Sequence, residues 1–480
     1  MKYARLTSLL FVVFLFSFSL CVQAEKREVH ILSANDMHAA LEAFPQLADI
    51  VDSLRTLYPG LLVFSAGDNR TGEPLNDMYE TPAYPMVALM NQVGFHATTL
   101  GNHEFDSGPE GLSKLISLSN FSYLCANVHP ADSLAIHLRP CQVFDVEGIR
   151  VGVVGAVQLG THGHPDTHPD NVRGISFTPF NETVAQYEWL RSKCDVVILL
   201  SHNGYEADVE SSAHFPWVDL IIGGHTHTQL DGGEKHNGIL ITQNENSLHK
   251  VTHITLVVDD GKVVDKKAEN INVRSWQGQN KVVADMVRYF SNNPAFSRVL
   301  TKAETPFTSY GELGSMMCDA FAGECGADVG IENYGGVRYD SLMAGPITVS
   351  DVLRLDPFGN DAVVMEVTGE ELRQMLMSCY ANDSYQFPWV SGVCCNAVVS
   401  SSDPTQVKKL TLTTIDGKKF DLKRKYRVVT NSFVASICDA PRKDQGRSIN
   451  RKTADLIIGY LEKFPSVSYQ GVRRVTLTVK

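Results

Sequence analysis

Short apolar runs alternate with longer amphipathic segments along the first half of the chain. Residues 97–100 are too few and too β-branched to form a helix alone, and they predict a buried strand. Similar runs predict strands at residues 29–32, 61–64, 151–154, 196–200, 220–222 and 239–242, and a closing hairpin over 254–264. Between them, residues 44–58 and 84–93 have helical patterns, and Gly94 ends the second. This alternation predicts a layered α/β domain over residues 25–275.

The pattern changes after residue 275. Residues 276–300 form one amphipathic segment, with Val282, Met286, Val287 and Phe290 at helical intervals, which predicts a linker helix. A smaller α/β unit over residues 301–480 follows. Its predicted elements are helices over 313–321 and from residue 350, a glycine-containing turn at 334–336, and strands at 362–367, 407–413 and 426–430. The sequence therefore predicts two domains joined by a helix.

Five of the predicted strands of the first half are followed by side chains that bind metals or protons. These are Asp36 and His38, then Asp68, then Asn102 and His103, then His202, and finally His225 and His227. Chance explains this regularity poorly, because the chain has only 16 His among 480 residues. Ligands of open α/β sheets lie beyond the carboxyl ends of the strands, so we expect these side chains to converge.

The first 24 residues have the pattern of a secretory signal peptide. Basic residues precede an apolar run over residues 9–20, and residues 22–24 supply a cleavage position. The run is too short to span a bilayer comfortably. Lipid attachment at Cys21 is the weaker alternative, because Leu20 stands where that signal needs a small residue. We expect cleavage after Ala24 and export to the periplasm or the medium.

Composition narrows the classes of partner. The formal charge of −12 is spread along the chain, which argues against a nucleic acid polymer as partner. No later apolar stretch predicts a transmembrane segment. Nine cysteines follow the predicted signal peptide, and export permits disulfides. Cys125 with Cys141, and Cys379 with Cys394 or Cys395, are candidate pairs.

The spacing of the ligand-type residues indicates two neighbouring metal sites. Asp36 and His38 are two residues apart, as are His225 and His227, so on extended segments each pair points to one side. The carboxylate of Asp68 has two oxygens and can bridge two cations. The remaining members of the set are Asn102, a neutral oxygen donor, and His202, an imidazole. Such mixed nitrogen and oxygen sites suit two divalent ions such as Zn, Mn or Fe.

Two such ions predict hydrolysis of a phosphate ester. Metal ions about 3.5 to 4 Å apart generate a hydroxide nucleophile and clamp the oxygens of an in-line displacement. His103 adjoins Asn102 but is not needed as a ligand, so it can protonate the leaving oxygen. Asp106 can accept the other ring proton of His103 and fix its tautomer.

Several strings in the sequence resemble those of calcineurin-like metallophosphatases, in the order of the 5′-nucleotidase branch. In the first half they are Asn35-Asp36-Met37-His38, Gly67-Asp68, Gly101-Asn102-His103-Glu104-Phe105-Asp106, Ser201-His202 and Gly223-Gly224-His225-Thr226-His227. In the second half they are Asn333-Tyr334-Gly335-Gly336-Val337-Arg338 and Asp356-Pro357-Phe358-Gly359-Asn360. The resemblance covers nearly the whole mature chain.

The resemblance implies a four-layered α/β/β/α sandwich followed by a smaller α/β domain that supplies the substrate pocket. It implies one metal held by Asp36, His38, Asp68 and His227, and a second held by Asp68, Asn102, His202 and His225. His103 and Asp106 match the family's catalytic dyad. Arg338 matches an arginine that contacts phosphate or ribose, Asn333 a hydrogen-bonding residue, and Phe358 one of two aromatic rings that sandwich the base.

The chain also departs from that family. The arginines usual just before residues 308–314 are absent. Asn431-Ser432-Phe433 is kept, but residues 436–441 replace the usual Gly-Gly-Asp-Gly string, which predicts the loss of one stacking face. Such a face contributes about 1 to 3 kcal/mol per base. We therefore expect a phosphoesterase acting on nucleotides; cyclic nucleotides, UDP-sugars and other esters remain alternatives, as does a metal-retaining binding protein without turnover.

One further run invites a third metal site. Residues 162–168 contain three histidines and an aspartate. Their proline and glycine neighbours favour a solvated loop instead.

Overall fold

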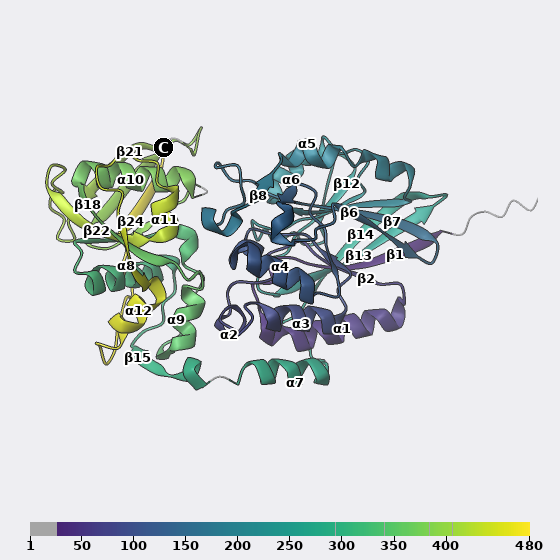
Figure 1. Cartoon of the computed structure of the whole chain (residues 1–480), viewed down its shortest axis with the longest axis horizontal. Helices are drawn as coiled ribbons and strands as arrows, with labels where there is room; N and C mark the ends of the chain where they lie inside the picture. Colours follow the sequence, from purple (N-terminus) through teal and green to yellow (C-terminus); the bar gives the residue numbers. More distant parts are fainter. Residues whose placement is uncertain (1–25, 293, 340, 384, 406) are drawn as a thin grey trace, which may run out of the picture.

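The computed structural model describes residues 26–480 except residues 293, 340, 384 and 406. The predicted signal peptide lies outside the described residues. Two α/β halves lie side by side, the first ending near residue 275 and the second beginning near residue 299 (Figure 1).

Two six-stranded sheets form the centre of the first half. The first sheet has the order β14-β13-β1-β2-β3-β4. Its strands are β1 Arg27–Ala34, β2 Leu62–Ser65, β3 Ala97–Thr98, β4 Ser122–Tyr123, β13 Lys250–Asp259 and β14 Lys262–Asn272. The second has the order β11-β12-β10-β9-β7-β6. Its strands are β6 Cys141–Val146, β7 Ile149–Val157, β9 Val196–His202, β10 Leu220–Ile222, β11 Glu234–His236 and β12 Ile239–Thr242.

Side chains along the strands alternate between the space separating the two sheets and the outer faces, so these sheets are the inner layers of a four-layered sandwich. In β9, Ile198 and Leu200 join the apolar cluster between the sheets, which also contains Ile31 of β1. Val197 and Leu199 point to the opposite face and pack in a separate outer cluster. Because successive side chains of a strand face opposite sides, a strand buried on both faces is apolar throughout.

Helices cover the outer faces of both sheets. The first sheet is covered by α1 Phe44–Leu57, α3 Tyr84–Val93, α4 Gly108–Leu118 and α7 Lys281–Phe290. The second carries α5 Phe180–Ala185 and α6 Tyr205–Ser212. The predicted α/β/β/α architecture is confirmed.

The second half contains a five-stranded sheet of order β19-β16-β22-β18-β23. These strands are β16 Val329–Glu332, β18 Asp361–Thr368, β19 Trp389–Val390, β22 Lys425–Asn431 and β23 Arg447–Lys452. Five helices accompany it, α8 Tyr310–Cys325, α9 Val349–Leu355, α10 Gly369–Asn382, α11 Ser432–Ile437 and α12 Thr453–Leu461. The smaller sheets are β15 Val299–Ala303 with β17 Gly345–Thr348, and β20 Cys394–Val399 between β21 Val407–Thr413 and β24 Val475–Val479.

The predicted linker helix is shorter than expected. It begins at Lys281, where the Asn280 side chain accepts a hydrogen bond from the Val283 backbone, and it ends at Phe290. Pro294 then begins a separate short turn, because proline has no N–H to continue an α-helix. Met286, Val287 and Phe290 face the core as predicted, but the first apolar position is Val283, which is 1% exposed, and not Val282, which is 56% exposed.

Neither predicted disulfide is present among the nine described cysteines, all of which are unbonded. Cys125 and Cys141 are not joined, and the Cys125 thiol contacts the Asn127 side chain instead. The pairing of Cys379 with Cys394 or Cys395 is likewise wrong. Cys379 lies near the end of α10, where Cys438 is the thiol that acts on its pKa.

Among the described residues, no helix is both long enough and apolar enough to cross a membrane.

An ion pair joins the two halves. Arg354 of α9 binds Glu73, the residue that caps the short helix α2 Pro74–Asp77. The Glu73 side chain is 6% exposed, so water cannot replace its partner. Burial raises the pKa of Glu73, which Arg354 opposes. The pair therefore fixes one point of contact between the halves.

Substitution of Arg354 by Met should lower the free energy of unfolding by about 1 to 3 kcal/mol, because Glu73 then remains buried without a partner. Urea unfolding measures this change. The double variant Glu73→Gln with Arg354→Met should recover most of the loss. Arg288→Met, which breaks an exposed ion pair with Asp285, is the matched control and should change stability by less than about 0.5 kcal/mol. Equal effects of Arg354→Met and Arg288→Met would contradict the role of the pair.

Candidate active site

The carboxyl ends of two parallel sets of strands meet at one site. In the first sheet β1, β2 and β3 run parallel, and in the second β7, β9, β10 and β12 do so. His202 is the last residue of β9, and the other predicted ligands lie in the loops that follow β1, β2, β3 and β10. The structure brings all seven predicted ligands together there, in two adjoining groups.

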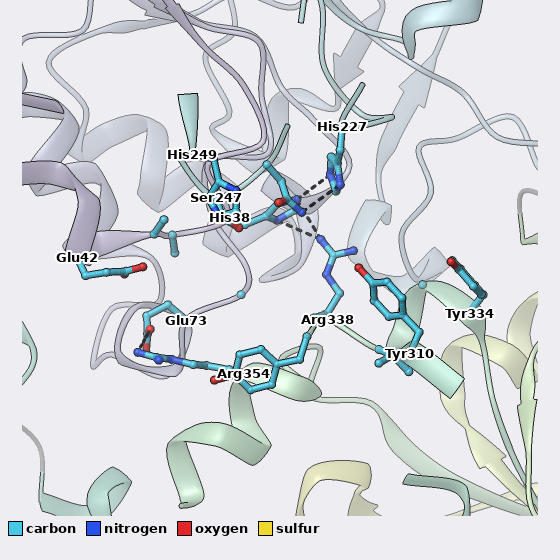
Figure 2. Close-up of a pocket in the computed structure, with 17 residues that line it drawn as sticks. His38, Glu42, Glu73, His227, Ser247, His249, Tyr310, Tyr334, Arg338 and Arg354 are labelled. Carbon is cyan, nitrogen blue, oxygen red and sulfur yellow. Dashed lines mark hydrogen bonds and ion pairs between the residues drawn. The ribbon is translucent and has the colours of Figure 1, made fainter. Parts of the chain in front are cut away.

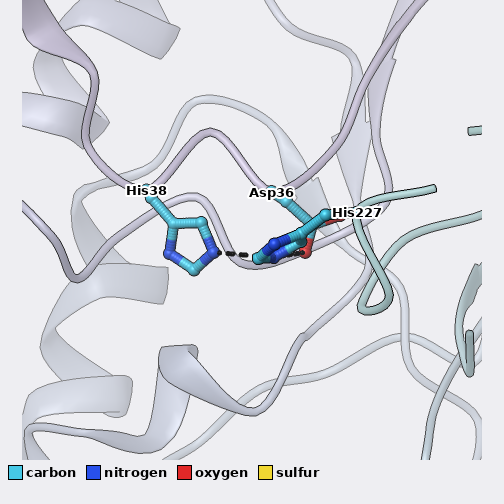
Figure 3. A group of neighbouring side chains, drawn as sticks. All are labelled: Asp36, His38 and His227. Atoms are coloured by element: carbon cyan, nitrogen blue, oxygen red, sulfur yellow. Dashed lines mark hydrogen bonds and ion pairs between the residues drawn. The ribbon is translucent and has the colours of Figure 1, made fainter. Parts of the chain in front are cut away.

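The first group is Asp36, His38 and His227 (Figure 3). The Nε2 atom of His227 lies 3.2 Å from Nε2 of His38 and 3.5 Å from Oδ1 of Asp36. One potential ligand atom from each residue lies within 4.8 Å of the others. This spacing fits three ligands around one cation.

The second group contains Asp68, His202 and His225. Nε2 of His202 lies 3.2 Å from Oδ2 of Asp68. The amide oxygen of Asn102 lies 3.3 Å from Nε2 of His202 and 3.1 Å from Nδ1 of His225. Asn102 therefore joins this group as a neutral oxygen donor, as predicted from its place in the chain.

Outer partners hold the imidazole rings in position. His38 Nδ1 donates to the Thr71 carbonyl at 2.9 Å, and His202 Nδ1 donates to the Ala66 carbonyl at 2.7 Å. A donor on one ring nitrogen leaves the other nitrogen unprotonated and free to bind a cation. His225 directs its second nitrogen towards the carboxylate of Asp166, at 3.7 Å. The rings are thus oriented for metal binding by groups outside the two clusters.

The backbone of the site is held in an uncommon conformation. Asp36, His38, Asp68, His225 and His227 have φ of 46°, 43°, 49°, 80° and 55°. This left-handed region disfavours side chains with a Cβ atom, and such outliers gather at functional sites. At Gly101 a Cβ atom would lie 2.2 Å from Oδ1 of Asp68, so only glycine permits the approach of these loops.

The charges of the site keep the carboxylates of Asp36 and Asp68 ionised. Burial, the strongest influence, would raise the pKa of Asp68, but the neighbouring imidazoles of His202, His103 and His38 together lower it well below its usual value. Burial opposes protonation of His202, yet Asp68 raises the pKa of His202 to about 10. Burial lowers the pKa of His38 and of His225, so these rings are neutral. A carboxylate that attracts a proton onto its neighbour in this way equally attracts a cation.

His103 and Asp106 form a hydrogen-bonded pair beside the clusters. Nδ1 of His103 donates to Oδ2 of Asp106 at 2.8 Å. Asp106 also accepts from the hydroxyl groups of Thr71 at 2.8 Å and Thr167 at 3.2 Å. Burial alone would lower the pKa of His103, but the Asp106 carboxylate outweighs burial and raises it. The pair lines the same cavity as Asp68 and Asn102.

Residues 162–168 are not simply a solvated loop. Thr167 is 5% exposed and holds Asp106, while Asp166 faces His225. Both residues, with His168, line the cavity. The residue types alone gave no sign of this, because the contacts join segments about 60 residues apart.

Glu104 has a structural role that the sequence pattern did not reveal. Its buried carboxylate accepts hydrogen bonds from the backbone N–H groups of Asp68, Asn69 and Gly101, at 2.9, 2.9 and 2.7 Å. It therefore ties the loop after β2 to the loop after β3. The only indication of this role in the sequence is that a glutamate not needed as a metal ligand stands inside the string of residues 101–106.

A cavity of about 470 Å³ extends from the clusters to the second half. Asn333, Arg338 and Phe358 line it, and so does Phe433, the second residue of α11. β22 and α11 bring the kept Phe433 to this cavity, whereas residues 436–441 supply no aromatic ring, so the loss of the aromatic face expected after the usual Gly-Gly-Asp-Gly string stays a prediction. The cavity thus has a polar end of histidines and carboxylates and an end with two aromatic rings.

Arg338 links this cavity to a second one of about 360 Å³, also between the halves. Figure 2 shows Arg338 reaching from the second half towards His38 and His227 of the first. Its Nη2 atom lies 3.0 Å from Nε2 of His38. The guanidinium also lies over the ring of Phe358, 5.7 Å from its centre, and that ring stacks on His103 at 5.7 Å.

Comparison with known proteins gives two family matches. Residues 29–229 match the calcineurin-like phosphoesterase family, and residues 289–441 match the 5′-nucleotidase C-terminal domain.

Relatives of similar organisation align over most of the chain. Protein UshA of Yersinia enterocolitica is 27% identical over 485 residues, covering 85% of each chain. The trifunctional nucleotide phosphoesterase protein YfkN of Bacillus subtilis is 25% identical over 469 residues, covering 85% of this chain and 32% of YfkN. Among solved structures, a 5′-nucleotidase precursor from Thermus thermophilus aligns with a TM-score of 0.82 and 23% identity, over 94% of this chain and 99% of that one.

Substitution of Glu104 by Ala should lower the free energy of unfolding by about 3 kcal/mol or more, because three buried N–H groups lose their acceptor. Urea unfolding measures the loss. Glu110→Ala, an exposed glutamate on α4, is the matched control and should lie within about 0.5 kcal/mol of the wild type. A Glu104→Ala protein as stable as the control would show that the two loops do not depend on this carboxylate.

Proposed function

Because the chain belongs to the calcineurin-like phosphoesterases of the 5′-nucleotidase type, which are metal-dependent phosphoric ester hydrolases, we propose that it hydrolyses nucleotide phosphate esters with two divalent cations. The observation that carries this proposal is the pair of adjoining His/Asp clusters at the converging strand ends. The same cavity holds a proton-donor pair and two aromatic rings, which a simple metal store would not need.

The donor set fits two ions of intermediate softness, Zn, Mn or Fe. Asp36, His38 and His227 would hold the first. The second would be held by Asn102, His202 and His225. Asp68 would serve both, since its carboxylate lies against His202 and its charge also acts on His38. Bound there, such ions activate water and neutralise the phosphoryl oxygens during in-line displacement.

The protein's own groups complete the reaction. His103, kept protonated by Asp106, donates a proton to the oxygen that leaves phosphorus. Arg338 binds the phosphate, because its guanidinium lies at the first cluster and forms planar bidentate contacts with such anions. Both groups act where negative charge develops.

The rest of the substrate extends into the second half. Phe358 and Phe433 would stack on the nucleobase, and Asn333 would supply a hydrogen bond. We take residues 25–275 as the catalytic domain, 276–300 as the linker and 301–480 as the substrate-binding domain. We further propose that residues 1–24 direct export, so that the enzyme acts on nucleotides outside the cytoplasm.

Metal analysis with mutagenesis tests the two-ion site. The purified chain should contain about two divalent ions, and chelation should abolish hydrolysis of AMP and p-nitrophenyl phosphate until a metal is restored. Asp68→Asn and His202→Ala should lower both metal content and turnover, the latter by about 100-fold or more. His214→Ala, an exposed histidine, is the control and should change neither. Full turnover in Asp68→Asn and His202→Ala would reject the mechanism.

Turnover rates on a panel of phosphate esters identify which class of ester is the preferred substrate. AMP, a cyclic nucleotide, a UDP-sugar and a nucleotide pyrophosphate differ in the group beyond the reacting phosphorus. The proposal requires a nucleotide to be preferred over p-nitrophenyl phosphate. Tight metal binding with no hydrolysis across the panel would instead identify a binding protein.

The role of His103 is tested by the leaving group. His103→Gln should lower kcat for AMP by about 10² to 10⁴, because the ribose alkoxide needs a proton to leave. The loss for p-nitrophenyl phosphate should be much smaller, since p-nitrophenolate leaves without one. Metal content should stay unchanged, and Asp106→Asn should show the same pattern more weakly. Equal losses on both substrates would exclude His103 as the proton donor.

A further inference from the structure

Cys379 and Cys438 lie together in the apolar core of the second half. Cys379 belongs to α10 and is fully buried, and Cys438 follows α11 directly and is 7% exposed. Both residues belong to the same apolar cluster, and each thiol shifts the pKa of the other, which places the two side chains as neighbours.

Hydrogen bonds between residues that flank the two cysteines hold the end of α10 against the residues that follow α11. The backbone N–H of Asp439 donates to the Ser378 hydroxyl at 2.9 Å. The Asn382 amide donates to the Ile437 carbonyl at 2.7 Å and to the Asp439 carboxylate at 3.2 Å. The neighbours of each cysteine are thus paired across the same gap, and these bonds hold Cys438 beside Cys379.

The two segments also carry one wall of the large cavity. Asp383 caps the end of α10, Gln386 follows it, and Phe433 is the second residue of α11; all three line the cavity. Asp383 further accepts a hydrogen bond from the backbone of Tyr334, which lines the same space. Movement of α10 relative to α11 would displace this wall.

We propose that Cys379 and Cys438 form a disulfide that clamps α10 to α11 and fixes the wall on the nucleoside side of the cavity. This inference rests on the proposed export and on the proposed site for the nucleoside. The hydrogen bonds from Asp439 to Ser378 and from Asn382 to Ile437 keep the two cysteines beside each other in the core. The bond would join residues far apart in the chain, which restricts the unfolded state strongly.

The chemistry needs a disulfide-bearing oxidant. The Cys438 thiolate attacks one sulfur of the oxidant and releases its first thiol. The Cys379 thiolate then attacks the Cys438 sulfur of the mixed disulfide and releases the second thiol. Two protein thiols are oxidised, one disulfide is reduced, and the two protons leave with the released thiols.

Cys438 is suited to the first attack. The neighbouring Cys379 thiol lowers the pKa of Cys438 to about 6, and the nearby Arg442 guanidinium acts in the same direction. A thiolate is the nucleophile in this exchange. Cys379, fully buried, has its pKa raised and acts second.

Mass spectrometry of the full chain tests the bond itself. The reduced protein is treated with glutathione disulfide, quenched with N-ethylmaleimide and digested without reductant. We expect one linked peptide pair containing residues 379 and 438, lighter by two hydrogens than the separate peptides. Alkylation of both cysteines, or linkage to a different cysteine, would overturn the proposal. This readout needs neither export nor catalysis.

Titration calorimetry tests whether the disulfide fixes the cavity wall. It measures the affinities for adenosine and for inorganic phosphate before and after oxidation. Oxidation should tighten adenosine binding by about threefold to tenfold, because a wall already fixed has less freedom to lose. Phosphate affinity should not change. The double variant Cys379→Ser with Cys438→Ser should bind adenosine like the reduced protein, and Cys325→Ser, which removes a half-buried thiol of α8, should keep the full response.

Two results would overturn the clamp. Equal adenosine affinity in both states would show that the bond does not set the wall. Absence of adenosine binding in either state would reject the nucleoside site of the proposed function as well, while the linked peptide would still decide whether the bond forms. Hydrolysis of p-nitrophenyl phosphate, measured separately, reports on the metal centre alone.

Discussion

The buried carboxylate of Asp68 is the interaction on which the rest of the site depends. It is 2% exposed, yet the imidazole of His202 keeps it ionised. An ionised group so far from water requires opposite charge and hydrogen bonds in fixed positions. The backbone of His103 supplies one hydrogen bond, to Oδ1 at 2.8 Å. The loops after β2 and β3 and the end of β9 are therefore fixed relative to one another by the needs of one carboxylate.

Most of the structure around that carboxylate serves to hold the loops in place. Glu104 ties two loops together through their N–H groups, and the close approach at Gly101 leaves no room for a larger residue. Carbonyl groups of Thr71 and Ala66 hold the rings of His38 and His202. Such outer contacts maintain the positive φ values, because strained residues persist only where their surroundings determine them.

The second half completes the site from the other side. Arg338 and Phe358 reach the first cluster and His103, while the Glu73 to Arg354 ion pair joins the halves nearby. The lining of the cavity thus comes from both halves, with histidines and carboxylates from the first and Arg338 and the aromatic rings from the second. Under the proposed function, substrate binding would depend on the relative position of the halves.

The sequence by itself determined the nature of the centre. Apolar runs at strand length followed by Asp, Asn and His identified the seven ligand candidates, and the order of the motifs indicated the family and the four layers. Local patterns were enough because strand ends in such sheets converge by geometry. Some local signals were missed: the capping box formed by Thr368 and Glu371 marks the start of α10, a helix absent from the predicted elements.

Only the tertiary structure decided the contacts that join distant segments. Phe433 could not be assigned to the cavity from its neighbours, and Thr167 gave no sign that it holds Asp106. Cys379 and Cys438 are neighbours because α10 packs against α11, which sequence spacing does not specify. Patterns along the chain record which face of an element is buried; they do not record which partner covers it.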